Sequence, residues 1–198
     1  MGNLRLSPDD RRAQLLALAA RMFTERPYDD FSMDDLAATA GVSKGLLYHY
    51  FSSKRALYVE VLQGAARELL DLMRPEPGLP LTEQLRAALL AYMAYVRQRA
   101  DAYRAMLRGG IGNDPEVAEV AEDVRRAIRE RILAGLEIPR PSPRLRITIT
   151  GWVGLVEAAS LDWLEHDDLD DVRLVDLLVD ALTALLASLQ SSSHRENR

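Results

Sequence analysis

Apolar residues recur along the chain at intervals of three and four, between breaks marked by glycine and proline. This spacing places them on one face of an α-helix, whereas a strand would need alternation at every second residue. The first helix is expected to open with Ser7 as its N-cap and to end at Pro27, because proline lacks an amide hydrogen and clashes with the preceding turn. Its apolar stripe consists of Leu15, Leu16, Ala19, Met22 and Phe23.

Capping residues and a glycine predict the next three helices. Ser32 caps a short helix that ends before Gly41, and Ser43 opens a second short helix that runs through Tyr48. A longer fourth helix is expected to begin at Ser52 or Ser53, with apolar residues along one face. The two short helices cannot be stable by themselves, so they must pack against the longer ones.

Two proline-rich stretches divide the rest of the chain. Residues 74–80 hold three prolines and one glycine, so we expect a linker there. Thr82 can cap the helix that follows, Asp101 a short one and Asp114 a long one. Two last helices are expected over residues 143–165 and 170–190, before a frayed tail at 191–198. The pattern therefore predicts an all-α protein of about nine helices.

Composition bears on function more than on fold. The 198 residues include 25 basic and 30 acidic ones, a formal net charge of −5, so any contact with nucleic acid must be local. The chain has no cysteine, which excludes disulfides and thiolate chemistry and favours a reducing cytoplasm. We see no signal peptide, and no apolar stretch approaches the roughly 20 residues that span a bilayer. A cytoplasmic protein without a membrane segment is expected.

The short helices on either side of Gly41 have the pattern of a helix-turn-helix. Ala37 and Ala40 are small enough to let two helices approach closely, and Gly41 can take the left-handed conformation of a tight turn. Between residues 36 and 59 the chain has three basic residues, Lys44, Lys54 and Arg55, and no acidic one. A positive segment inside an acidic protein is what contact with DNA phosphates requires.

Residues 31–57, FSMDDLAATAGVSKGLLYHYFSSKRAL, resemble the DNA-binding domain of the TetR family of bacterial transcriptional regulators. With the first helix, the resemblance covers about the first 60 residues, and the rest of the chain agrees in architecture. It implies a helix-turn-helix DNA-binding domain of three helices at 1–55, a connecting helix at 56–73, and a larger helical domain for effector binding and dimerisation at 74–190. The remaining residues, 191–198, are a tail.

The resemblance implies that the helix opened by Ser43 enters the major groove of DNA. The DNA-binding residues expected on this basis are Ser32, Met33, Ser43, Lys44, Gly45, Leu46, Tyr48, His49 and Lys54. Leu46 stands where the family often has Thr or Ser, and Pro27 stands where it usually has glycine. A compact helical hairpin without DNA contact, with Tyr48 in its core, is the alternative; Tyr50 and Phe51 are expected to be core residues.

The last two helices are candidates for a dimer interface. One recognition helix makes few base contacts, so such proteins bind a palindromic operator as twofold dimers. The segment 147–164 is apolar on nearly every face, and Gly151, Gly154 and Ala158 would let another helix approach closely. We expect a homodimer through roughly residues 143–190; a fully intramolecular core is the alternative.

The resemblance also implies a small molecule that releases the protein from DNA. The residues expected to contact it are Tyr92, Met93, Val96, Tyr103, Met106, Leu107, Trp152 and Val156. These mostly apolar side chains favour a hydrophobic or aromatic effector, although such a stripe can equally be core. Glu157 could face this pocket or the dimer interface, and the sequence leaves both open.

The sequence gives no sign of catalysis. His166 lies among acidic residues, but a solvated turn between helices explains them better than a metal site. No nucleophile, phosphate-loop or paired-carboxylate motif is present, and no cofactor or metal is expected. We therefore expect a ligand-responsive regulator, by family default a repressor. A helical enzyme and a dimeric scaffold that uses the C-terminal block are the alternatives.

Overall fold

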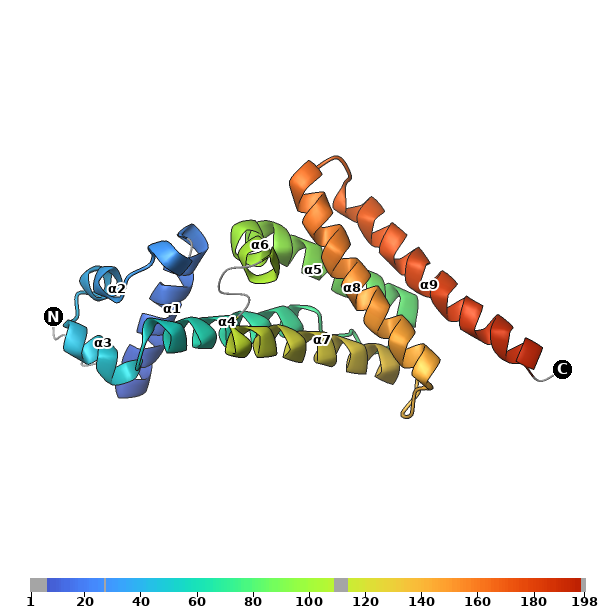
Figure 1. Cartoon of the computed structure of the whole chain (residues 1–198), viewed down its shortest axis with the longest axis horizontal. Coiled ribbons are helices and arrows are strands. Elements are labelled where there is room, and N and C mark those ends of the chain that lie inside the picture. Colours follow the sequence, from blue (N-terminus) through green and yellow to red (C-terminus); the bar gives the residue numbers. More distant parts are fainter. Residues whose placement is uncertain (1–6, 27, 109–113, 197–198) are drawn as a thin grey trace. The chain divides into compact units, whose positions relative to one another are not determined.

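A computed structural model describes residues 7–26, 28–108 and 114–196, except for the side chains of 105, 106, 108 and 190–196 (Figure 1). Within these ranges the chain forms α-helices and one 3-10 turn, with no strand. The elements are α1 (Pro8–Glu25), η1 (Tyr28–Asp30), α2 (Met33–Ala40), α3 (Lys44–Tyr50), α4 (Lys54–Leu72), α5 (Leu81–Gln98), α6 (Ala100–Arg108), α7 (Pro115–Gly135), α8 (Pro143–His166) and α9 (Asp171–Glu196). The all-α fold with an N-terminal helix-turn-helix is confirmed.

The chain divides into two compact units. Unit 1 comprises residues 1–67 and 101–120, and unit 2 comprises residues 68–100 and 121–198. Helices α4 and α7 each contribute residues to both units. This division by compactness differs from the ranges expected from the sequence, which describe functional domains and stay a prediction.

Serine caps position the helices of unit 1. The hydroxyls of Ser7, Ser32 and Ser43 accept hydrogen bonds from main-chain N–H groups three residues further on, at the starts of α1, α2 and α3. Ser53 does the same for α4, accepting from the N–H of Ala56 at 3.0 Å. Gly41 lies between α2 and α3 with φ of +65°, in the left-handed region that favours glycine. The capping serines predicted for α1 to α4 and the predicted glycine turn are thus confirmed.

The core of unit 1 joins the helix-turn-helix to α1, α4 and the start of α7. Its buried members include Leu15, Ala19, Phe23, Leu36, Leu47, Phe51, Leu57, Val117 and Val120. The Phe23 ring stacks on Phe31 with centroids 4.0 Å apart and meets Tyr58 edge-on at 4.8 Å. Short helices α2 and α3 are therefore held by packing rather than by their own propensity.

Unit 2 is built on the packing of α5, α8 and α9. The indole N–H of Trp152, in α8, donates to the main-chain oxygen of Leu178, in α9, at 2.9 Å. The guanidinium of Arg97 lies over the Trp163 ring, 4.3 Å from its centroid, and joins α5 to α8. Among the residues the structure describes, no helix is long and apolar enough to cross a membrane.

Four sequence expectations need correction or extension. Thr82 does not cap α5: the helix begins at Leu81, and its N-cap position is Pro80, without a side-chain hydrogen bond. The expected cap of the next helix, Asp101, likewise lies inside α6, which begins at Ala100. Helix α3 ends at Tyr50, two residues later than expected. Helix α9 continues to Glu196, so residues 191–196 are helical rather than frayed. The expected break at Pro27 lies outside the described residues, although α1 does end just before it, at Glu25.

Candidate nucleic-acid interface

Helix α3 presents one polar face to solvent and one apolar face to the core of unit 1. Leu47 is fully buried and Phe51, just after the helix, is 1% exposed, so they anchor α3. Tyr48 is 43% exposed and Leu46 is 37% exposed. The other exposed residues of the predicted DNA-binding set in this region are Ser43, Lys44, Gly45 and His49. Tyr50 is partly buried against the core, and the hairpin alternative that placed Tyr48 in the core is wrong.

An ion pair holds Lys44 on this surface. The ammonium lies 2.7 Å from Oδ1 of Asp34, which stands in the first turn of α2. The hydrogen bond to the Asp34 carboxylate raises the pKa of Lys44 above its ordinary value. Lys44 is therefore charged and held beside the turn, and a DNA phosphate would have to compete with Asp34 for it.

Ser32 and Met33 play structural parts at the start of α2. The Ser32 hydroxyl accepts a hydrogen bond from the N–H of Asp35 at 3.0 Å. The Met33 side chain is 6% exposed and belongs to the core of unit 1. Its side chain is thus not part of the exposed surface, and the role in DNA binding that the resemblance predicts for Met33 would have to come through its main-chain N–H at the helix N-terminus.

Lys54 is the first residue of α4 and packs on an aromatic ring. Its ammonium lies 4.3 Å from the centroid of Tyr28, and Nζ lies 3.4 Å from the main-chain oxygen of Asp29. The side chain is partly exposed. A cation held at a helix N-terminus, where the helix dipole also attracts anions, suits a DNA phosphate.

Arg55 makes a contact that the sequence did not reveal. Its guanidinium binds both carboxylate oxygens of Asp114, with Nε to Oδ2 at 2.5 Å and Nη2 to Oδ1 at 2.8 Å, and it also reaches Glu116 at 2.9 Å. The hydrogen bonds from Arg55 lower the pKa of Asp114. The two residues are 59 positions apart, and each looks like an ordinary surface charge in the sequence. Arg55 is therefore engaged in joining α4 to α7 inside unit 1.

The residues expected to contact an effector are divided between the two units. In unit 2, the residues 9% exposed or less are Tyr92, Met93, Val96, Trp152 and Val156. Tyr103 is buried in unit 1, and Leu107, also in unit 1, is partly buried. The side chain of Met106 lies outside the described residues. Their role in ligand binding stays a prediction.

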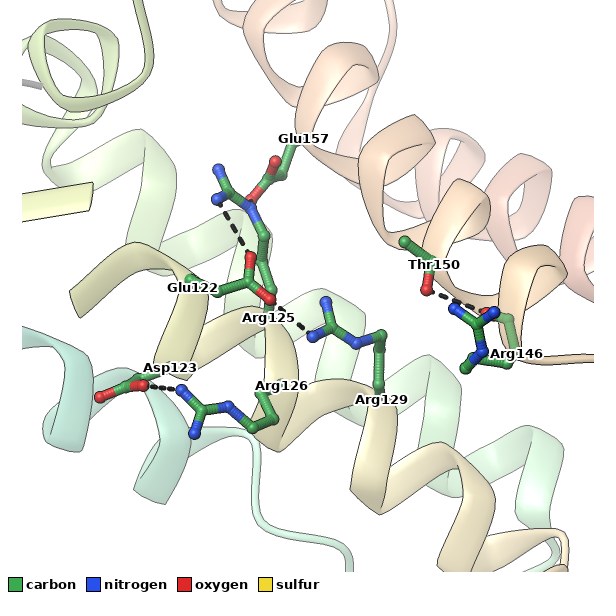
Figure 2. A network of polar contacts seen from close by, with 8 residues as sticks. All are labelled: Glu122, Asp123, Arg125, Arg126, Arg129, Arg146, Thr150 and Glu157. Carbon is green, nitrogen blue, oxygen red and sulfur yellow. Dashed lines mark hydrogen bonds and ion pairs between the residues drawn. The ribbon is translucent and has the colours of Figure 1, made fainter. Parts of the chain in front are cut away.

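Glu157 has a definite partner. Its carboxylate accepts a hydrogen bond from Nε of Arg125, in α7, at 2.8 Å (Figure 2). The side chain therefore points from α8 to a charged cleft beside α7 rather than into an apolar pocket. The sequence carried no signal for this pairing, because the two residues lie on different helices 32 positions apart.

Exposed apolar side chains follow α8 and α9. They are Ile147, Leu155, Val172, Leu177 and Leu185, with exposures from 39% to 62%. A Cβ added at Gly151 or Gly154 would meet nothing within 4 Å. Where exposed apolar side chains lie together on a surface, they mark contact sites for other proteins, so α8 and α9 remain candidates for an interface.

His166 is the last residue of α8 and makes a hydrogen bond within the final turn of the helix. Its Nδ1 lies 3.0 Å from the main-chain oxygen of Asp162, and this hydrogen bond raises the pKa of the imidazole. Among the described residues no group of three or more histidine and acidic side chains is placed to hold a metal ion.

Comparison with known proteins identifies the family. The model described as "Tetracyclin repressor-like, C-terminal domain" matches residues 81–185, more than half of the chain. The model described as "Bacterial regulatory proteins, tetR family" matches residues 15–61, which include the helix-turn-helix. The chain belongs to the TetR family of bacterial transcriptional regulators.

Individual relatives agree with this assignment. The transcriptional activator FasR of Mycolicibacterium smegmatis is 32% identical over 173 residues, which cover 82% of this chain and 76% of FasR. The transcriptional repressor KstR2 of Rhodococcus jostii is 29% identical over 161 residues, covering 81% of this chain and 70% of KstR2. A solved TetR-family regulator from Streptomyces coelicolor is 31% identical, with a TM-score of 0.86, and the match covers 92% of this chain and 83% of that one.

Proposed function

We propose that the protein is a ligand-responsive transcriptional regulator that binds a palindromic operator as a homodimer, with α3 in the major groove. The observation that carries the proposal is the division of α3 into a buried anchor, Leu47, and an exposed face with Lys44, Gly45 and Tyr48. A seven-residue helix exposes too few side chains to specify a site alone, so two copies are needed.

The dimer is proposed to form through α8 and α9. Their exposed leucines, with Ile147 and Val172, leave apolar surface that a second copy would remove from water. Gly151 adds a place where helix backbones can approach closely. Twofold symmetry then presents two recognition helices to one face of the DNA.

We propose release from DNA by a small molecule bound in the C-terminal part of the chain. The buried aromatic and methionine side chains of α5 and α8 favour a hydrophobic or aromatic ligand. The relatives named above include both a repressor and an activator, so the direction of regulation is proposed separately. We propose repression. A reporter joined to the operator should gain expression when the gene is deleted; a loss of expression would indicate activation.

We propose a non-enzymatic role, which is supported by membership of a family of transcriptional regulators. A protein that acts on the bacterial chromosome would work in the cytoplasm. A helical enzyme or a scaffold remains the competing function, and neither predicts sequence-specific DNA binding.

The test is selection of binding sites from fragmented genomic DNA by the purified full-length protein. We expect recovered fragments to share an inverted repeat with half-sites about one helical turn apart. Tyr48→Ala should recover no such site while keeping the helical content, thermal unfolding and dimeric mass of the wild type, because Tyr48 is exposed in the free protein. Recovery of unrelated fragments by the wild type, or the same motif from the variant, would contradict the proposal.

A further inference from the structure

Helices α7 and α8 enclose a polar cleft within unit 2, with a volume of about 450 Å³ (Figure 2). Its charged and hydroxyl side chains are Glu122, Arg125, Arg129, Arg146, Thr150 and Glu157. The polar residues of α7 are three and four positions apart, and those of α8 are four and seven apart, so on each helix they lie on the side that faces the cleft. The volume lies within the range of clefts that hold small molecules.

The cleft carries more positive than negative charge. Arg129 donates to Oε1 of Glu122 at 2.6 Å, and Arg125 donates to Glu157 at 2.8 Å. Arg125 also lies 3.6 Å from Glu122. Arg146 has no carboxylate partner within the described part of the chain, so three guanidinium groups face two carboxylates.

These ion pairs leave many N–H groups available. Each guanidinium carries five N–H donors, and the pairs with Glu122 and Glu157 occupy only a few of those on Arg125 and Arg129. Both arginines are less than one third exposed, and the carboxylates hold them in place. Figure 2 shows Arg129 and Arg146 reaching toward the cleft from opposite helices. Such an arrangement is suited to an oxyanion that accepts hydrogen bonds from both sides.

The cleft also has room next to these donors. Gly154 lines it, and a Cβ at that position would meet nothing within 4 Å. Val153 adds an apolar side chain to the lining. At about 100° per residue, the exposed Leu155 lies about half a turn from Arg146 around α8, so it faces away from the cleft, whereas the exposed Ile147 lies at the edge of the cleft-lining face.

We propose that this cleft binds the anionic group of a small molecule, a phosphate or a similarly multivalent oxyanion, between Arg129 and Arg146. Arg125 adds further donors, and Glu122 and Glu157 position the arginines. The bound group would be part of the effector, and this regulatory consequence rests on the proposed function; binding of the anion does not. The effector would then combine an anionic group with the apolar part inferred above.

Binding can be tested on the full-length protein with pyrophosphate as the probe, at constant ionic strength, by calorimetry and by thermal unfolding. We expect pyrophosphate to bind and to raise the unfolding temperature, inorganic phosphate to bind more weakly, and acetate to have little effect. Arg146→Gln should weaken pyrophosphate binding by about tenfold or more. Its unfolding temperature without ligand should match the wild type, since Arg146 has no ion pair to lose in the described residues.

Arg126→Gln is the matched control. Arg126 lies on α7 next to the cleft-lining Arg125, pairs with Asp123 and does not line the cleft. This variant should bind pyrophosphate as the wild type does. Failure of the wild type to bind, equal loss in both variants, or unchanged affinity in Arg146→Gln would each overturn the anion site. Pyrophosphate binding that depends on Arg146, in a protein without an operator, would instead uphold the site and refute the proposed function.

Discussion

Gly45 is the residue of α3 whose identity the fold explains least. It is exposed, and a Cβ at this position would meet nothing within 4 Å. A glycine inside a helix costs about 0.5–1 kcal/mol relative to alanine, because it loses more backbone freedom on folding. Gly45 therefore does not stabilise the fold of the free protein. A glycine at this position is consistent with a close approach of the helix backbone to DNA.

Gly45→Ala should make the protein more stable and a weaker DNA binder. We expect the free energy of unfolding to rise by about 0.5–1 kcal/mol and operator affinity to fall by about tenfold. Chemical denaturation and fluorescence anisotropy measure the two effects. Gly64→Ala in α4 is the control: its added methyl meets only the end of Arg67, at 4.0 Å, and it should leave DNA affinity unchanged. Undiminished affinity in Gly45→Ala would refute the close approach.

The stability of unit 1 should depend on pH through Asp114. Because Arg55 lowers its pKa, the folded state holds the charged carboxylate more strongly than the unfolded chain does. The resulting stability is fully present above the unfolded pKa of about 3.9 and is lost as pH falls through the lower, folded value.

Asp114→Asn should therefore lower the unfolding temperature at neutral pH and reduce its decline on acidification. In the wild type, Oδ1 of Asp114 accepts a hydrogen bond from the N–H of Glu116 at 3.0 Å. Asparagine keeps a side-chain oxygen that can accept this bond, so the substitution retains the cap of α7 and removes only the charge. Thermal unfolding between about pH 7 and pH 3 compares the two proteins. Parallel curves for wild type and variant would show that the Arg55 pair contributes no pH dependence.

The candidate site was only partly predictable at the level of single residues. The family resemblance predicts DNA contact for Lys44, Gly45 and Tyr48, and all three are exposed on α3, whose register the capping serine and the glycine turn fix locally. The burial of Met33 and the pairing of Arg55 with Asp114 depend on packing between distant segments, and nothing near them in the sequence encodes it.

Helices were predictable where their start signals are local. Ser7, Ser32 and Ser43 all cap the helices that they were expected to cap, since each signal acts within three residues. Thr82 is a good capping residue, but α5 already begins at Leu81, and the main-chain oxygen of Pro80 accepts the first hydrogen bonds of the helix, from the N–H groups of Glu83 and Gln84. The extension of α9 beyond residue 190 was missed because serine, histidine and arginine neither demand nor forbid a helix.

The exposed face of α8 predicts how the dimer will respond to substitution. Leu155 is 43% exposed in the single chain, so the fold of one protomer does not require a leucine there. In the proposed interface Leu155→Glu would bury a charge without a partner, at a cost of at least about 2 kcal/mol. The dimer dissociation constant should then rise by roughly thirtyfold or more.

Analytical ultracentrifugation measures this change. Leu72→Glu is the control, because Leu72 is 54% exposed and belongs to α4 rather than to α8 or α9. It should leave the dimer intact. An equally stable dimer in Leu155→Glu would place the interface elsewhere.

On the scale of the whole molecule, α4 and α7 each have residues both in unit 1, which holds α3, and in unit 2, which holds the charged cleft. A ligand that prefers one arrangement of the protein shifts the population toward it, and DNA does the same. A hundredfold loss of DNA affinity needs about 2.7 kcal/mol of difference in ligand affinity between the two states.

Linkage makes this coupling testable in both directions. An effector that weakens operator binding must itself bind more weakly, by the same factor, to the protein saturated with operator. Calorimetry with and without operator DNA provides both numbers. Effector affinity that is indifferent to DNA would show that the effector acts by another route, such as occupying the DNA surface of α3.

Sequence-specific recognition of DNA by this protein can be measured with DNA fragments from around its own gene. The purified protein would be titrated with these fragments at two salt concentrations, with random DNA as competitor. We predict competitor-resistant binding, with an affinity that falls with salt at a log-log slope of several units, about 0.9 for each phosphate neutralised. Weak binding that random DNA abolishes, from every fragment and at both salt concentrations, would contradict the account.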